Sequence, residues 1–108
     1  MKRYTVRLTR EVEADLLDLF EYIAQKDSVA NAHHVLDELE TLISNLDQHP
    51  ERGHYPAELS EHGIKEFREV LFKPYRVIYR LINKHVVVLD CFDGRRDMQL
   101  LLERRLLR

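Results

Sequence analysis

Residues 67–92 read FREVLFKPYRVIYRLINKHVVVLDCF, and this stretch decides the fold. It contains three apolar runs rich in β-branched and aromatic residues, at 67–72, 75–82 and 85–92, each typical of a β-strand. Pro74 stands just before the second run, and Asn83-Lys84 is a two-residue connection to the third. A connection this short joins antiparallel neighbours. The stretch therefore predicts a three-stranded antiparallel sheet whose last strand, the most apolar, lies centrally.

Two amphipathic helices are expected before the sheet. The first follows Thr9, a good N-cap, and should end near Lys26, and Ser28 can cap the second. Because only two or three residues join the helices, they must run antiparallel as a long helical hairpin. The apolar positions recur at helical spacing: Val12, Leu16, Leu19, Phe20 and Ile23 in the first helix, and Ala32, Val35, Leu36, Leu39, Leu42, Ile43 and Leu46 in the second.

Shorter elements are expected towards both ends of the chain. Residues 4–8 alternate and are rich in β-formers, which predicts an N-terminal strand, the fourth of the molecule. Residues 49–65 lose all periodicity and predict a loop. Asp97 can cap a C-terminal helix from Met98 to about Leu107. The chain of 108 residues is thus expected to form a single α+β domain over 1–108.

Composition excludes several classes of function. The net charge is −2, so a nucleic-acid partner would have to meet a local basic patch. Cys91 is the only cysteine, which rules out an internal disulfide, and we expect it in the core. The histidines lack the paired spacing of metal ligands, so no metal and no cofactor are expected. No apolar segment follows Met1 and no run could span a membrane, so we expect a cytoplasmic protein.

Arginines form the candidate functional pattern. Arg76 and Arg80 alternate with apolar residues, so both side chains should leave the same face of the sheet. Arg68 on the neighbouring strand is expected to join them, and Arg95-Arg96 follows the central strand. Guanidinium groups suit phosphates and carboxylates, so such a cluster can hold a nucleic-acid backbone or an acidic protein segment. The alternative is neutralisation within the chain, by ion pairs with Glu66, Glu69, Asp90, Asp93 and Asp97.

Two further segments offer weaker signals. His54 and Tyr55 lie in the loop and have no visible partner, so we expect them at the surface. The C-terminal stretch is more apolar than a solvent-facing helix needs. Leu101 and Leu102 can cover the core while other leucines stay exposed. This surplus predicts either a binding site for a partner protein or plain packing against the sheet.

Taken in order, these features resemble the RelE/ParE superfamily of toxins from bacterial type II toxin–antitoxin modules. The resemblance spans most of the chain. Its most specific match is Phe67-Arg68-Glu69 followed by Pro74-Tyr75-Arg76-Val77-Ile78-Tyr79. Weaker matches are Tyr4–Leu8 with Ala14-Asp15-Leu16 and Tyr22-Ile23, the P-x-x-G loop at Pro50-Glu51-Arg52-Gly53, and Val86–Leu89 with Arg95-Arg96-Asp97.

The resemblance implies one of two activities. RelE-like members are ribosome-dependent endoribonucleases that cut mRNA, and Arg68, Arg76 and Arg96 fall where that branch has basic catalytic residues. ParE-like members have the longer helical hairpin seen here, generally lack that catalytic set, and act by binding and poisoning DNA gyrase. This chain has Val70 where a strand lysine is expected and Leu102 near the position of the terminal aromatic. Arginine is a poor general base, so no proton-transfer partner is evident.

We therefore expect a ParE-like toxin that causes growth arrest without being an enzyme. The resemblance also implies a cognate antitoxin that neutralises it in a hetero-oligomer. A RelE-like enzyme acting on mRNA at the ribosome is the first alternative, and an antitoxin-binding domain without toxicity is the second. The residues expected to bind partners are Arg68, Arg76, Arg80, Arg95, Arg96, Leu101 and Leu102.

Overall fold

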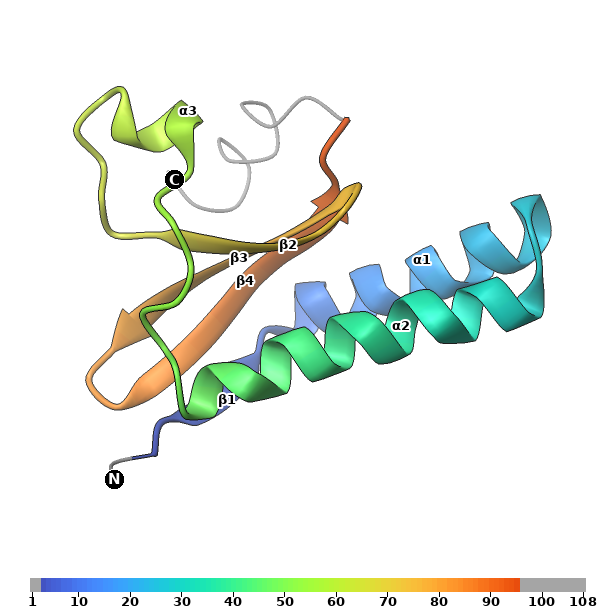
Figure 1. Cartoon of the computed structure of the whole chain (residues 1–108), viewed down its shortest axis with the longest axis horizontal. Coiled ribbons are helices and arrows are strands. Elements are labelled where there is room, and N and C mark those ends of the chain that lie inside the picture. Colours follow the sequence, from blue (N-terminus) through green and yellow to red (C-terminus); the bar gives the residue numbers. More distant parts are fainter. Residues whose placement is uncertain (1–2, 96–108) are drawn as a thin grey trace.

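The computed structural model describes residues 3–95, and Figure 1 shows their arrangement. In chain order the elements are β1 (Thr5–Leu8), α1 (Arg10–Lys26), α2 (Val29–Ser44), the 3-10 helix η1 (Asn45–Asp47), α3 (Ala57–Ser60), β2 (Arg68–Phe72), β3 (Tyr75–Ile82) and β4 (His85–Asp93). These elements confirm the predicted α+β class. The predicted C-terminal helix, with Leu101 and Leu102, lies outside the described residues.

The helical hairpin forms where the capping residues predicted it. The Thr9 side chain accepts a hydrogen bond from the backbone N–H of Val12, and Ser28 Oγ accepts one from the N–H of Asn31 at 3.0 Å. Each bond satisfies one of the donors that a helix leaves unpaired at its first turn. The predicted apolar stripes of both helices lie in one hydrophobic core. The long antiparallel hairpin is therefore confirmed.

The sheet has four strands in the order β1-β4-β3-β2. The strands β2, β3 and β4 pair antiparallel, as predicted. β1 extends the sheet along the other edge of β4 and runs parallel to it, so the sheet is mixed and not wholly antiparallel. A parallel pair needs a long crossover connection, and the chain between β1 and β4 supplies one. Asn83, with φ 56°, takes the left-handed position of the tight turn before β4, a conformation that asparagine adopts more readily than most residues.

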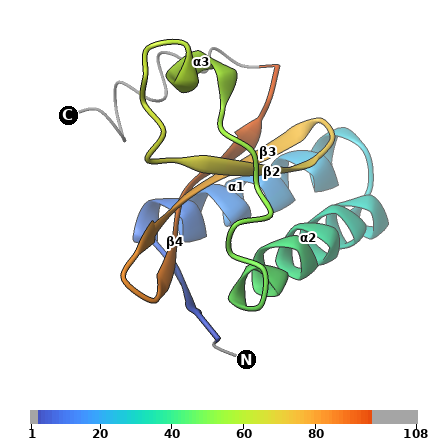
Figure 2. The same ribbon diagram turned by 60° about the vertical axis from the view of Figure 1, so that its left-hand side comes forward.

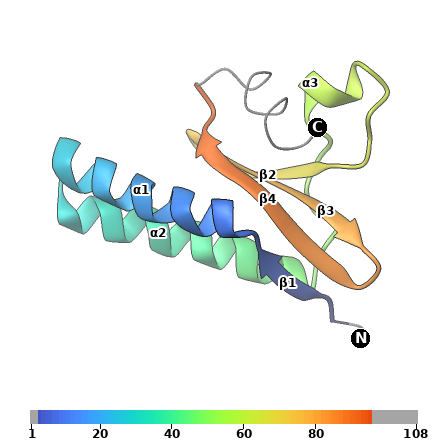
Figure 3. The same ribbon diagram turned by 180° about the vertical axis from the view of Figure 1, so that it is seen from behind.

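The two faces of the sheet are covered unequally. The helical hairpin packs on one face and α3 stands over the other, as Figures 2 and 3 show. The main core lies between the hairpin and the sheet and includes Leu39 and Tyr79, both fully buried. A smaller cluster on the opposite face joins Leu59, Phe67, Ile78 and Phe92. The second face is thus only partly covered by the described residues.

Three smaller features complete the comparison with the sequence. The loop expected at 49–65 contains the four-residue helix α3, which buries Leu59 against the second face of the sheet. Cys91 is buried as predicted, and burial raises the pKa of its thiol to about 12. Among the described residues no helix is long and apolar enough to span a membrane.

Candidate functional site

Arg76 is held between two carboxylates. Its Nε lies 2.7 Å from Glu69 Oε1 and its Nη1 lies 2.7 Å from Glu58 Oε2, and the second guanidinium nitrogen bonds the remaining oxygen of each carboxylate. The Arg76 side chain is 14% exposed and the Glu69 side chain 4%. The hydrogen bonds from Arg76 lower the pKa of Glu58. This guanidinium group is already neutralised and hydrogen-bonded within the chain.

The backbone around Arg76 fits its side chain closely. A Cβ placed on Gly94 would lie 2.7 Å from Arg76 Cδ, so only glycine lets the chain pass over the arginine stem. The Gly94 N–H donates to the carbonyl of Pro74 at 2.7 Å. The guanidinium also lies over the ring of Phe92, 5.6 Å from its centroid. Arg76 thus ties α3, β2 and the end of β4 together.

Arg68 does not join Arg76 and Arg80, which corrects the expectation from sequence. The register of the sheet sets Arg68 opposite Tyr79, whose ring packs in the core on the helix side. Arg76 and Arg80 lie over Phe92 and Phe67 on the opposite face, so the prediction that these two share a face is confirmed. Side chains of directly opposed residues share a face of the sheet. The predicted arginine cluster is therefore divided between the two faces.

Arg68 and Tyr79 together hold the P-x-x-G loop. Arg68 Nη1 donates to the carbonyls of Glu51 and Gly53. The Arg68 guanidinium carbon lies over the ring of Tyr55, 4.6 Å from the ring centroid. The Tyr79 hydroxyl donates to the carbonyl of Pro50 and accepts the N–H of Gly53. A Cβ on Gly53 would lie 2.6 Å from that hydroxyl oxygen. The loop motif is thus explained by packing and backbone hydrogen bonds.

Arg80 lies on the less covered face, in a row that crosses the sheet. Val87 of β4 stands opposite Arg80 on one side and opposite Arg7 of β1 on the other. The Arg7 Nε donates to His85 Nδ1 at 3.4 Å. Glu66 approaches Arg80 at 3.7 Å, a loose and exposed pair. We call Arg7, Arg80, His85 and Val87 the open sheet face, and it is the cationic surface that the structure brings together.

The remaining predicted residues separate into two groups. Arg95 is exposed and forms an ion pair with Asp93, with Nε 2.9 Å from Oδ1. Arg96, Leu101 and Leu102 lie outside the described residues. The proposed neutralisation of arginines is confirmed for Arg76 with Glu69 and for Arg95 with Asp93, whereas Arg80 has only the loose pair with Glu66.

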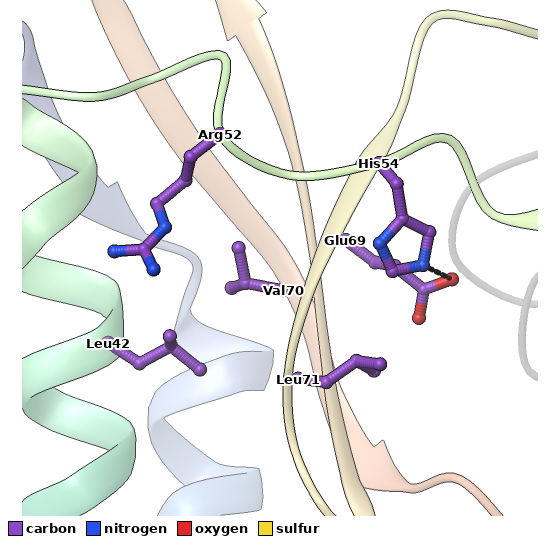
Figure 4. A pocket seen from close by; sticks show the side chains of 6 residues that line it. All are labelled: Leu42, Arg52, His54, Glu69, Val70 and Leu71. Carbon is purple, nitrogen blue, oxygen red and sulfur yellow. Dashed lines mark ion pairs between the residues drawn. The ribbon is translucent and has the colours of Figure 1, made fainter.

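A hollow of about 200 Å³ opens where α2, the loop and β2 meet. We call it the β2 edge hollow, and Figure 4 shows its lining residues, which are Leu42, Arg52, His54, Glu69, Val70 and Leu71. Arg52 points towards the helix side in that view, whereas His54 lies across β2 against Glu69. His54 Nε2 is 3.2 Å from Glu69 Oε2. The apolar walls and one cationic side chain suit an acidic, apolar ligand.

Sequence reasoning missed the importance of several residues. Glu58 belongs to a stretch without periodicity, and nothing local indicates that it meets Arg76. His54 is exposed as expected, yet it has a partner, because loop and strand form a bridge between His54 and Glu69. Within residues 3–95 no group of three or more His, Cys, Asp or Glu side chains could hold a metal ion.

Known proteins resemble this chain in sequence and in fold. Residues 6–98 match the family model described as the ParE toxin of the type II toxin–antitoxin system parDE. Toxin ParE3 of Caulobacter vibrioides is 31% identical over 90 residues, which cover 83% of this chain and 86% of that protein.

Two solved structures share the fold at lower sequence identity. The chromosomal ParDE toxin–antitoxin system from P. aeruginosa has a TM-score of 0.71 and 16% identity, and covers 84% of this chain and 96% of the other. The toxin–antitoxin complex RelBE2 from Mycobacterium tuberculosis has a TM-score of 0.60 and 21% identity, and covers 84% and 98%. Both therefore support the architecture described above.

Proposed function

Because the chain belongs to the ParE toxin family of type II toxin–antitoxin systems, we propose that it arrests growth by binding and poisoning DNA gyrase. The proposal includes no chemical step carried out by the toxin itself. It further includes neutralisation by a cognate antitoxin in a hetero-oligomeric complex within the cytoplasm. The family membership supplies the toxin role, and the geometry of the arginines favours binding over catalysis.

The observation that carries this choice is the position of Arg76. The RelE-like alternative needs Arg76 to meet the RNA backbone, yet four hydrogen bonds to Glu58 and Glu69 occupy its guanidinium group. Arg68, the second candidate, donates to two loop carbonyls and to the Tyr55 hydroxyl. Releasing Arg76 would leave the buried Glu69 carboxylate without its arginine, and releasing Arg68 would remove a donor from the part-buried Gly53 carbonyl. Both arginines therefore support the fold more directly than they support RNA cleavage.

An antitoxin partner is supported by the fold. The two structures of similar architecture are both of toxin–antitoxin systems. Two of the surfaces that the described residues offer a partner are the open sheet face and the β2 edge hollow. Both offer cations, so an acidic antitoxin segment suits either of them.

One observation favours the RelE-like alternative enough to keep it. The imidazole of His54 lies against the carboxylate of Glu69, and 59% of the His54 side chain is exposed. A histidine oriented by a carboxylate is a common acid–base arrangement in enzymes. If the chain cleaves mRNA, His54 is the residue that would move the proton, which arginine cannot do at neutral pH.

The two functions are separated by what happens in cells that express the toxin without an antitoxin. Our proposal expects growth arrest with broken chromosomal DNA and intact mRNA. The RelE-like alternative expects cleaved mRNA and intact DNA, and His54→Ala should then abolish the cleavage. Normal growth with folded toxin present would instead favour a domain that only binds antitoxin. Growth arrest would thus rule out the non-toxic antitoxin-binding domain, and intact mRNA would rule out the mRNA-cleaving enzyme.

A further inference from the structure

The open sheet face carries hydrogen-bond donors that few acceptors match. Arg80 has one loose ion pair, with Glu66 at 3.7 Å, and its buried Nε has no hydrogen-bond partner in the described part of the chain. Arg7 forms no ion pair within that same part, and its Nε donates to His85 Nδ1 at 3.4 Å. Because Nδ1 accepts, a neutral His85 ring carries its proton on Nε2, which is a further donor. This face therefore differs from Arg76, whose guanidinium is already bonded to two carboxylates.

The sheet holds the two arginines of this face at a fixed separation. Both stand opposite Val87, because β1 and β3 lie on either side of β4. Neighbouring strands are about 4.8 Å apart, so the Cα atoms of Arg7 and Arg80 are about 10 Å apart. The Arg80 guanidinium also lies over the ring of Phe67, 5.6 Å from its centroid, a contact that restricts its position. The face thus presents two cationic groups whose placement does not depend on a partner.

The cations continue beyond this face at the corner of the sheet where β1 begins. There the Thr5 N–H donates to the carbonyl of Lys84 at 2.9 Å, so the start of β1 lies beside the turn between β3 and β4, as Figure 3 shows. Lys84 is exposed. Arg3, just before β1, has a 69% exposed side chain and a long pair with Asp47 at 3.9 Å. The positive charge therefore forms a line across the sheet corner.

Many acidic side chains lie on the opposite layer of the molecule. The helices α1 and α2 carry eight of the 19 aspartates and glutamates, namely Glu11, Glu13, Asp15, Asp18, Glu21, Asp37, Glu38 and Glu40. The hairpin packs on the face of the sheet that points away from Arg7 and Arg80 (Figure 2). The chain has a net charge of −2, yet this separation gives it a cationic side. A polyanion is thus attracted to the open sheet face first.

From this arrangement we infer that the open sheet face binds the phosphate backbone of duplex DNA. Arg7 and Arg80 each contact a phosphate through the guanidinium fork, and Lys84 supplies a third contact. Such contacts position a protein on a duplex without reading its sequence. The toxin then meets the DNA as well as the enzyme that acts on it. The choice of DNA among phosphate polymers rests on the proposed function, whereas the anion chemistry of the face does not.

Other occupants complement this face less well. The chain's own residues beyond Arg95 carry four arginines and two acidic residues, so their net charge has the same sign as the face. An acidic protein segment offers separate carboxylates, whereas a duplex offers a continuous series of charges that matches a line of cations. A second copy of the chain would offer its acidic hairpin. The protein occupants are outcomes of the test below.

The test is the binding of the purified chain to a short labelled DNA duplex, followed by fluorescence anisotropy between about 50 and 200 mM salt. Three phosphate contacts predict a slope of log K against log salt of about −2.7, which is a loss of about fortyfold over that range. Arg7→Ala and Arg80→Ala should each reduce the slope by about 1, whereas Arg80→Lys should keep it. Lys26→Ala removes an exposed cation at the end of α1, and as the matched control it should change neither affinity nor slope.

Several results would overturn the inference. The first is no binding of the unchanged protein at the lowest salt, a readout that needs no variant to fold. An unchanged slope in both alanine variants would place the contact elsewhere on the chain. Tighter binding of an RNA duplex of the same sequence would exclude DNA as the ligand. Displacement of the duplex by polyglutamate of equal charge would mean that the face meets an acidic protein, and self-association that blocks DNA binding would mean that a second copy covers it. Failure of the proposed function would appear separately, as undiminished supercoiling by gyrase while the duplex still binds with the expected slope.

Discussion

The Arg76 guanidinium reaches across to the buried Glu69 carboxylate, with Nε 2.7 Å from Oε1, and not outwards to a ligand. The two residues are not directly opposed, because Arg76 stands opposite Leu71 and Glu69 stands opposite Ile78. They are diagonal neighbours on one face of the sheet, a distance that a long side chain spans. Arg76, one of the three arginines that the resemblance to RelE-like enzymes points to, therefore links elements of the fold through buried hydrogen bonds.

Replacing Arg76 should destabilise the protein strongly. Arg76→Ala would leave Glu69, 4% exposed, with a buried charge whose remaining partner is the exposed His54 imidazole. Breaking such a buried pair costs about 3 kcal/mol or more in free energy of unfolding. Urea unfolding of the two proteins at pH 7 measures this loss. Arg95→Ala, which removes an exposed pair, is the matched control and should leave the unfolding midpoint unchanged. Equal midpoints for Arg76→Ala and the unchanged protein would contradict the role assigned to Arg76.

The contribution of Glu58 should depend on pH. Its carboxyl has a pKa lowered from 4.5, mainly by the hydrogen bond from Arg76. A group whose pKa is lower in the folded state stabilises that state above the pKa of the unfolded chain. The stability difference between the unchanged protein and Glu58→Gln should therefore be full at neutral pH and shrink as the pH falls below 4.5. Urea midpoints measured for both proteins across this range check it. A difference that stays constant down to acidic pH would contradict the pair.

The loop motif should tolerate no side chain at Gly53. A Cβ there would lie 2.6 Å from the Tyr79 hydroxyl oxygen and 2.8 Å from the Glu69 carbonyl. We expect Gly53→Ala to lower the free energy of unfolding by about 2 kcal/mol, the usual effect of overpacking. Tyr79→Phe should cost about 1 kcal/mol, because the Pro50 carbonyl and the Gly53 N–H both lose their partner. Thermal unfolding of the variants would show whether both changes are instead neutral.

Arg80 should matter for binding more than for folding. Its pair with Glu66 is long and exposed, so Arg80→Ala should change the unfolding midpoint little. If the open sheet face meets an acidic surface, Arg80→Glu should weaken toxin action clearly, and Arg80→Lys should largely preserve it. The concentration of toxin needed for half-inhibition of gyrase measures this effect. Matching values for Arg80→Glu and the unchanged toxin would exclude this face from the target contact.

Local signals predicted much of the fold. Thr9 and Ser28 marked where the helices begin, and the apolar stripes from Val12 to Leu46 marked the faces that they bury. All four strands also followed from runs of β-forming residues. The parallel pairing of β1 with β4 did not, since the choice of strand partner depends on how the whole chain crosses the sheet.

The candidate site was predicted less well, for a physical reason. Which face a strand residue occupies depends on register, and a shift of one residue reverses it. Spacing within β3 was enough to place Arg76 and Arg80 together, but not to place Arg68 on β2 relative to them. The contact of Arg76 with Glu58 depends on α3, whose four residues have no periodic signal. An open strand edge, such as that of β2, can be located only once the strand order is known.

The most direct test of the central claim is a supercoiling assay with purified gyrase and purified toxin. We predict that micromolar toxin inhibits supercoiling and leaves cleaved DNA held by the enzyme. Toxin mixed first with its antitoxin should not inhibit, and the same toxin should leave mRNA intact in a ribosome-containing extract. Undiminished supercoiling at micromolar folded toxin, with mRNA cut in that extract, would contradict the account.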